Sequence, residues 1–131
     1  MTHLKWFLIG VLISVGMAAC SEAIAHEMTP TYPKLGVSHV DGLYKTTLQL
    51  FNKREEVEYY EIGVFDKDKN PIPFVSNYKI MKINYLGHVT FDVFIRKQDV
   101  SRAVYVCSRS KLRKDNKVRT AVASVICSKF R

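Results

Sequence analysis

The chain has 131 residues and a formal net charge of +8, with 47% hydrophobic and 11% aromatic residues. This length excludes two full domains, and the composition excludes a largely disordered chain. The charge is placed unevenly: residues 26–101 carry ten basic and ten acidic side chains, whereas residues 102–131 carry nine basic residues and one acidic residue, Asp115.

The first 25 residues have the features of a secretory signal peptide. Lys5 precedes an uncharged apolar stretch at residues 6–17, and Ala-Ile-Ala at residues 23–25 offers a signal-peptidase site. The apolar stretch is shorter than the roughly 18 residues that cross a bilayer. We therefore expect cleavage after residue 25 and a mature domain of residues 26–131 outside the cytoplasm, periplasmic or secreted.

A second export signal overlaps the first. Residues 17–20, Met-Ala-Ala-Cys, resemble the lipobox at which bacterial lipoproteins are cut and lipidated. Lipidation of Cys20 would tether the domain to a membrane. Both processing routes remain open, and both place the rest of the chain outside the cytoplasm.

The mature part indicates short strands separated by turns, because apolar and polar residues alternate along several segments. After an extended lead-in at residues 26–34, we expect strands or edge pieces at residues 44–50, 57–65, 72–75, 78–83, 89–95, 103–107 and 121–127. No segment shows a convincing helical period. About seven strands without an amphipathic helix predict an all-β fold, an immunoglobulin-like antiparallel β-sandwich.

Two cysteines remain beyond the signal region, Cys107 and Cys127. An even pair of cysteines in an oxidising compartment predicts a disulfide. The sequence contains no Cys-x-x-Cys spacing, so zinc binding and thioredoxin-like chemistry have no support.

Residues 103–107, Ala-Val-Tyr-Val-Cys, are similar to the sixth strand of an immunoglobulin domain, where a tyrosine stands two positions before a cysteine. Together with residues 47–52, 89–95 and 125–128, this pattern resembles the N-terminal domain of periplasmic pilus-assembly chaperones. The resemblance implies that the disulfide clamps the last two strands at the base of a long basic loop.

In that family the last strand lends alternating apolar side chains to an unfinished subunit, which is a form of β-strand addition. The resemblance implies that a protein partner would meet one of two alternating rows of the last strand. The first row consists of Val122, Ser124 and Ile126, and the second of Ala121, Ala123 and Val125.

The C-terminal charge gathers around the loop between the last two predicted strands. Its basic residues are Arg109, Lys111, Arg113, Lys114, Lys117 and Arg119. Such a patch attracts an acidic surface, although a solvated loop kept soluble by charge gives the same pattern. Export and the lack of a Gly-aromatic RNA-binding motif argue against nucleic acid as the partner.

Cleavage after residue 25 would leave His26 at the N-terminus of the mature chain. An N-terminal histidine can bind copper through its amine and ring nitrogens, and His88 or His39 would then supply a second ligand. The alternative is that these histidines have no metal-binding role. We expect no cofactor, and we expect no enzymatic activity because no Gly-x-Ser-x-Gly or other catalytic motif is present.

The sequence thus supports an exported, non-enzymatic protein-binding domain as the first hypothesis. The second hypothesis is a structural component of an envelope, a surface or a virus particle. A copper-binding protein with His26 as a ligand is the third.

Overall fold

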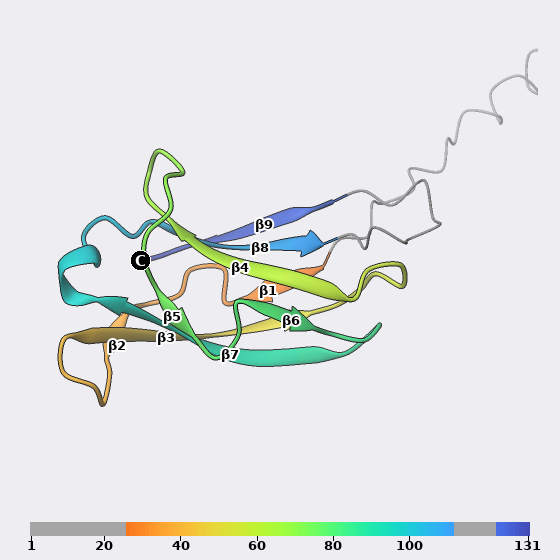
Figure 1. Ribbon diagram of the computed structural model, residues 1–131, viewed down its shortest axis with the longest axis horizontal. Helices are drawn as coiled ribbons and strands as arrows, with labels where there is room; N and C mark the ends of the chain where they lie inside the picture. The colour runs from red at the N-terminus through yellow and green to blue at the C-terminus, as the bar shows by residue number, and fades with distance from the viewer. Residues whose placement is uncertain (1–25, 112–122) are drawn as a thin grey trace, which may run out of the picture.

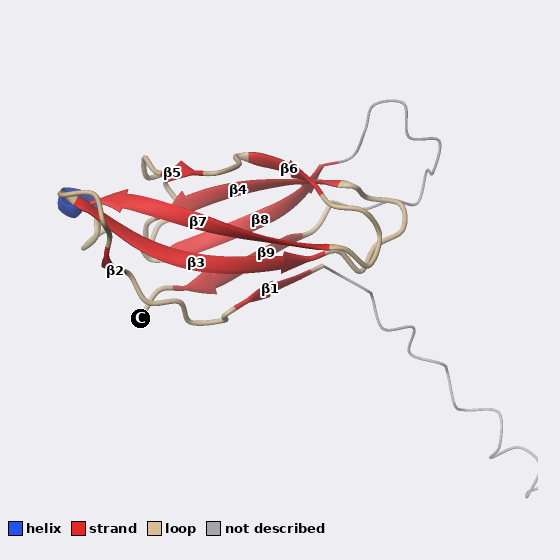
Figure 2. Ribbon diagram, turned by 90° about the horizontal axis from the view of Figure 1, so that it is seen from below, coloured by secondary structure: helices blue, strands red, loops and turns tan. Residues whose placement is uncertain are grey.

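The computed structural model describes residues 26–111 and 123–131. In this part of the chain, two antiparallel β-sheets pack face to face (Figures 1 and 2). Sheet A has the order β1-β3-β7-β5, with β2 also paired to β3. Its strands are β1 (Glu27–Thr29), β2 (Gly36–Val37), β3 (Leu43–Phe51), β5 (Val75–Ser76) and β7 (His88–Arg96). The predicted immunoglobulin-like β-sandwich is confirmed.

Sheet B has the order β6-β4-β8-β9, so β9 lies at its edge. Its strands are β4 (Tyr59–Phe65), β6 (Ile80–Lys82), β8 (Tyr105–Lys111) and β9 (Val125–Lys129). Within the described residues, no helix has the length and apolar character that a membrane crossing requires.

The core lies between the two sheets and follows from the alternation of the long strands. β3 and β7 pair along their full length, and β4 and β8 pair in the same way in sheet B. Each of these strands turns every second side chain inward, as the sequence predicts. The largest fully buried apolar side chains are Leu48, Leu50, Val57, Tyr60, Val64, Phe91, Val93, Ile95 and Val106.

Two strands lie further toward the C-terminus than expected. The strand predicted at residues 103–107 runs from Tyr105 to Lys111, and the strand predicted at residues 121–127 runs from Val125 to Lys129. The first prediction ended too early because two serines follow Cys107 at alternate positions and interrupt the apolar pattern. Both serines are nevertheless buried in the sandwich.

The first segment of the domain connects the two sheets. β1 pairs with β3 in sheet A, and the chain leaves that sheet at the cis peptide bond Thr29–Pro30. The carbonyls of Thr31 and Pro33 then accept hydrogen bonds from the N–H groups of Lys129 and Arg131, at 3.1 and 3.0 Å. The predicted lead-in therefore covers part of the β9 edge.

A buried carboxylate holds the corner between β7 and β8. The 3-10 helix η1 (Lys97–Asp99) turns the chain from sheet A to sheet B, and Asp99 is only 2% exposed. Its two oxygens accept hydrogen bonds from the guanidinium groups of Arg102 and Arg96. These bonds hold the pKa of the Asp99 carboxyl below its usual value.

Candidate functional site

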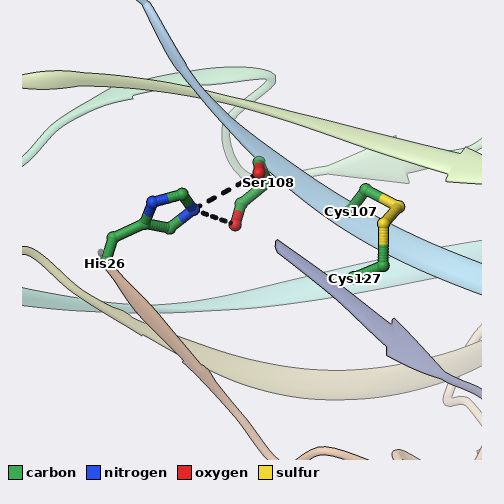
Figure 3. Close-up of a disulfide and its surroundings, with 4 residues drawn as sticks. All are labelled: His26, Cys107, Ser108 and Cys127. Carbon is green, nitrogen blue, oxygen red and sulfur yellow. Dashed lines mark hydrogen bonds between the residues drawn. A yellow bond between two sulfur atoms is a disulfide. The ribbon is translucent and has the colours of Figure 1, made fainter. Parts of the chain in front are cut away.

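The predicted disulfide between Cys107 and Cys127 is confirmed, and it joins the last two strands of sheet B (Figure 3). The two cysteines stand directly opposite each other, with their Cα atoms 4.0 Å apart. Opposed residues in an antiparallel ladder are about 5.5 Å apart in a hydrogen-bonded pair and about 4.5 Å apart in a non-hydrogen-bonded pair. The short separation therefore marks a non-hydrogen-bonded pair.

This register decides which backbone groups of β9 face outward. The Ser124 carbonyl accepts a hydrogen bond from the Ser110 N–H, and the Phe130 N–H donates to the Val104 carbonyl. The backbone N–H and C=O groups of the even-numbered residues of β9 thus point toward β8. The N–H and C=O groups of odd-numbered residues point away from β8, because backbone direction alternates along a strand.

Part of this outer side of β9 makes no backbone hydrogen bond, although β1 passes beside β9. The N–H of Lys129 is taken by Thr31, as described above. No backbone hydrogen bond joins the outward groups of Val125 or Cys127 to another described residue. An edge strand with unpaired backbone groups is a template for another strand. We call this two-residue stretch the open edge.

The side chains of β9 also divide into two rows. Val125 and Cys127 are exposed on the outer face of sheet B, and Ile126 packs partly against the core. Ser124 faces inward and joins the hydrogen-bond network described next. Of the predicted row Val122, Ser124 and Ile126, the last two therefore face the interior, and Val122 lies outside the described residues, as does Ala121.

A buried histidine connects the start of the domain to sheet B. His26, just before β1, is 2% exposed. Its Nε2 lies 2.7 Å from Ser108 Oγ and 3.3 Å from the Ser108 carbonyl oxygen (Figure 3). Its Nδ1 lies 3.1 Å from Ser124 Oγ, and its ring packs on Tyr60 with centroids 4.7 Å apart. One side chain thus contacts β4, β8 and the residue before β9.

Arg54 lies in the same region and is 7% exposed. Its Nη1 donates to the hydroxyls of Ser110 and Ser124, at 3.4 Å each. Its Nε and Nη2 pair with Glu56 at 2.8 and 2.7 Å. A backbone hydrogen bond of Glu56 and the contact with Arg54 lower the pKa of the Glu56 carboxyl. We define the polar cluster as His26, Arg54, Tyr60, Ser108, Ser110 and Ser124.

Asn52 supports the polar cluster from the β3 end. Its Nδ2 donates to the carbonyls of Val57 and Ile83, at 2.6 and 2.9 Å. Its Oδ1 accepts the Tyr60 hydroxyl and the Arg54 N–H. Burial raises the pKa of Tyr60 to about 12, so the hydroxyl remains a donor. The buried side-chain polar atoms of Asn52 and Tyr60 are therefore paired, as a stable interior requires.

The geometry gives the copper hypothesis no support. Both ring nitrogens of His26 lie within hydrogen-bonding distance of serine oxygens. His88 is on β7 opposite Phe51, beside a separate hollow that Glu27 and Gln49 also line. Among the described residues, no group of three or more His, Cys, Asp or Glu side chains could hold a metal ion.

Only the beginning of the predicted basic patch can be placed. Arg109 and Lys111 project from the outer face of β8, and the Nζ of Lys111 forms an ion pair with Glu61 at 2.9 Å. The four remaining members lie outside the described residues: Arg113, Lys114, Lys117 and Arg119.

No family model and no curated protein matches the sequence. The fold resembles those of solved structures, among them two chaperones and a PapD-like domain. The E. coli chaperone DraB has a TM-score of 0.60 at 13% identity, over 81% of this chain and 53% of DraB. The periplasmic chaperone SfaE has a TM-score of 0.53 at 12% identity, over 82% of this chain and 56% of SfaE. The PapD-like domain 7 of human CEP192 has a TM-score of 0.54 at 8% identity, over 90% of this chain and 93% of that domain.

These likenesses confirm the resemblance to chaperones at the level of the fold. The chain spans about half the length of the two chaperones and nearly all of the CEP192 domain. The identities are too low to transfer a binding activity, because one fold can carry many functions.

Replacing both Cys107 and Cys127 with serine is expected to lower the free energy of unfolding by about 3 kcal/mol. The disulfide closes a sequence separation of 20 residues, and its removal lets the unfolded chain explore more conformations. Denaturant unfolding followed by fluorescence measures the change. Wild-type protein unfolded with a reductant is the control and should match the double variant. A decrease of less than about 1 kcal/mol in the free energy of unfolding would contradict a stabilising role for the disulfide.

Stability is expected to fall as the pH is lowered from about 6.5. Burial, and then the nearby Arg54 charge, lower the pKa of His26 below 6.5, so the unfolded state binds its proton first. The lowered pKa values of Glu56 and Asp99 act in the same direction, but only below their usual values of 4.5 and 3.8.

The pH effect is measured by urea unfolding between pH 5 and 7.5. The variant His26→Gln should show a flatter profile over this range than the wild type, and the control His39→Gln, at an exposed position, should keep the wild-type slope. Equal slopes for His26→Gln and the wild type would show that His26 does not cause the dependence.

Proposed function

We propose that this chain is an exported, non-enzymatic protein-binding domain that captures a segment of a partner protein by β-strand addition to the open edge of β9. The observation that carries the proposal is the unpaired backbone of Val125 and Cys127 at the end of sheet B. An added strand would complete the ladder with main-chain hydrogen bonds, which supply affinity with little dependence on sequence.

The open edge is held in a fixed position, which favours binding over fraying. The disulfide fixes β9 against β8 at its centre. The C-terminal end of β9 is bonded to Thr31, and the residue before the strand is bonded to Ser110 and His26. A strand that is already ordered loses less conformational entropy when it binds a partner.

The disulfide also supports a location outside the cytoplasm, because structural disulfides persist in oxidising compartments. The apolar segment and small residues before residue 26 support export by a cleaved signal peptide. The fold shared with two chaperones supports a protein as the partner, and the basic residues that follow β8 would favour an acidic one.

The variant Val125→Pro is expected to weaken partner capture by roughly tenfold, because proline removes the outward N–H and obstructs the approach of a strand. The N–H of Val125 makes no hydrogen bond to β8, so the variant should keep the wild-type melting temperature. A photo-crosslinking residue is placed at Lys129 of the exported full chain, because this exposed position is the last residue of β9.

Crosslinked adducts identified by mass spectrometry measure the capture. Val37→Pro is the matched control, because it places a proline at an exposed position of β2, a short strand that pairs only with β3. Val125→Thr keeps the backbone donor and should retain capture. Undiminished adducts with Val125→Pro, at unchanged stability, would exclude strand addition at this edge.

A further inference from the structure

A hollow of about 460 Å³ lies on the outer face of sheet B, over the disulfide. The register brings its floor together from three strands: Gly63 of β4 stands opposite Cys107 of β8, which stands opposite Cys127 of β9. Val125 extends the floor along β9. This volume is in the range of about 300–1,000 Å³ that is typical of ligand sites. The strand-addition proposal does not use this face.

Gly63 and Phe65 create the depth of the hollow. A Cβ atom at position 63 would lie 2.8 Å from the ring of Phe65. The ring therefore lies against the Gly63 backbone, where any larger residue would displace it. Phe65 also lines the hollow, so its ring forms an apolar wall beside the disulfide, of which Cys127 is exposed and Cys107 is buried. Such a surface suits an apolar side chain from a partner.

A tight turn places a positive charge beside this wall. Lys69 has a φ of 66°, in the left-handed region that few residues other than glycine adopt. The Asp66 carboxylate fixes the turn by accepting the N–H groups of Asp68 and Asn70, at 2.8 and 2.9 Å. The Nζ of Lys69 lies 3.6 Å from the centroid of the Tyr105 ring, and Lys69 lines the hollow.

The charges around the hollow are unbalanced. Glu61 is the acidic residue of the lining, and it is already paired with Lys111. Arg109 and Lys69 also line the hollow, and neither has an ion-pair partner among the residues that the structure describes. An apolar floor between two such cations is complementary to a ligand that is apolar at one end and anionic at the other.

We propose that this hollow binds an acidic peptide segment of a protein partner. An aromatic or aliphatic side chain would lie on the disulfide and Phe65, and a neighbouring carboxylate would pair with Arg109. In an extended peptide, residues i and i+2 are on the same face, so the apolar and acidic residues would be separated by one position.

Three peptides test this with the oxidised full-length chain, followed by NMR titration of the backbone amides. They are acetyl-Phe-Ser-Glu-amide, the same peptide with Gln in place of Glu, and the same peptide with Ala in place of Phe. The first should shift the amides of Gly63, Phe65 and Cys107 saturably. It should bind about threefold more tightly than the Gln peptide, the advantage of an exposed ion pair, and more tightly than the Ala peptide.

The variant Arg109→Gln should remove the preference for Glu over Gln. Lys97→Gln is the matched control, because it removes the same charge from an exposed position that does not line the hollow. Equal affinities for the three peptides, shifts away from the hollow, or no binding would overturn the proposal. Shifts of the same amides when only the protein concentration is raised would also overturn it, because a second copy of the chain would then occupy the hollow. Because Val125 borders both the hollow and the open edge, the proline variant does not test the hollow, whereas Arg109→Gln on β8 does.

Discussion

The register between β8 and β9, fixed where Cys107 and Cys127 face each other, is the constraint on which the candidate site depends. A slip of one residue would separate the two sulfur atoms and would exchange the inward and outward rows of β9. The existing register gives Ser124 and Ile126 to the interior and leaves the backbone of Val125 and Cys127 open. The covalent bond therefore fixes both the position of the edge strand and the side that it offers.

The polar cluster reinforces the same register from inside the sandwich. His26 bonds to Ser108 on β8 and to Ser124 before β9, and Arg54 reaches Ser110 and Ser124. The ion pair between buried Arg54 and exposed Glu56 contributes little net stability, because solvent screens the attraction at Glu56 and the burial of Arg54 opposes it. Its directional bonds instead disfavour other registers, in which these polar groups would lose their partners. The cluster therefore acts mainly on specificity of packing.

The sandwich, its long central strands and the disulfide could be predicted because each has a local sequence signal. The alternation at residues 89–95 predicts β7, and the two cysteines of the expected mature chain predict their own pairing. The limits of β8 could not be predicted in the same way. Its inward serines are stabilised by His26 and Arg54, which are 82 and 56 residues away from their partners.

In the candidate site, too, some features have a local sequence signal and others depend on residues that are distant in the sequence. The resemblance indicated the last strand as the binding element and left two rows open. The register, which is a tertiary property, turns Ser124 and Ile126 inward and Val125 outward. The hollow over the disulfide had no sequence signal beyond an unremarkable glycine. It depends on Gly63, Cys107 and Cys127 standing in line across three strands.

Residue-resolved amide hydrogen exchange along β9, in the oxidised and unbound domain, tests the central claim most directly. Slow exchange at Ile126 and Ser128, with fast exchange at Val125 and Cys127, is the predicted alternation, because only the even-numbered N–H groups are bonded to β8. Equal protection at all four amides would mean that another strand already covers this side of β9, and would contradict the assignment of an open edge.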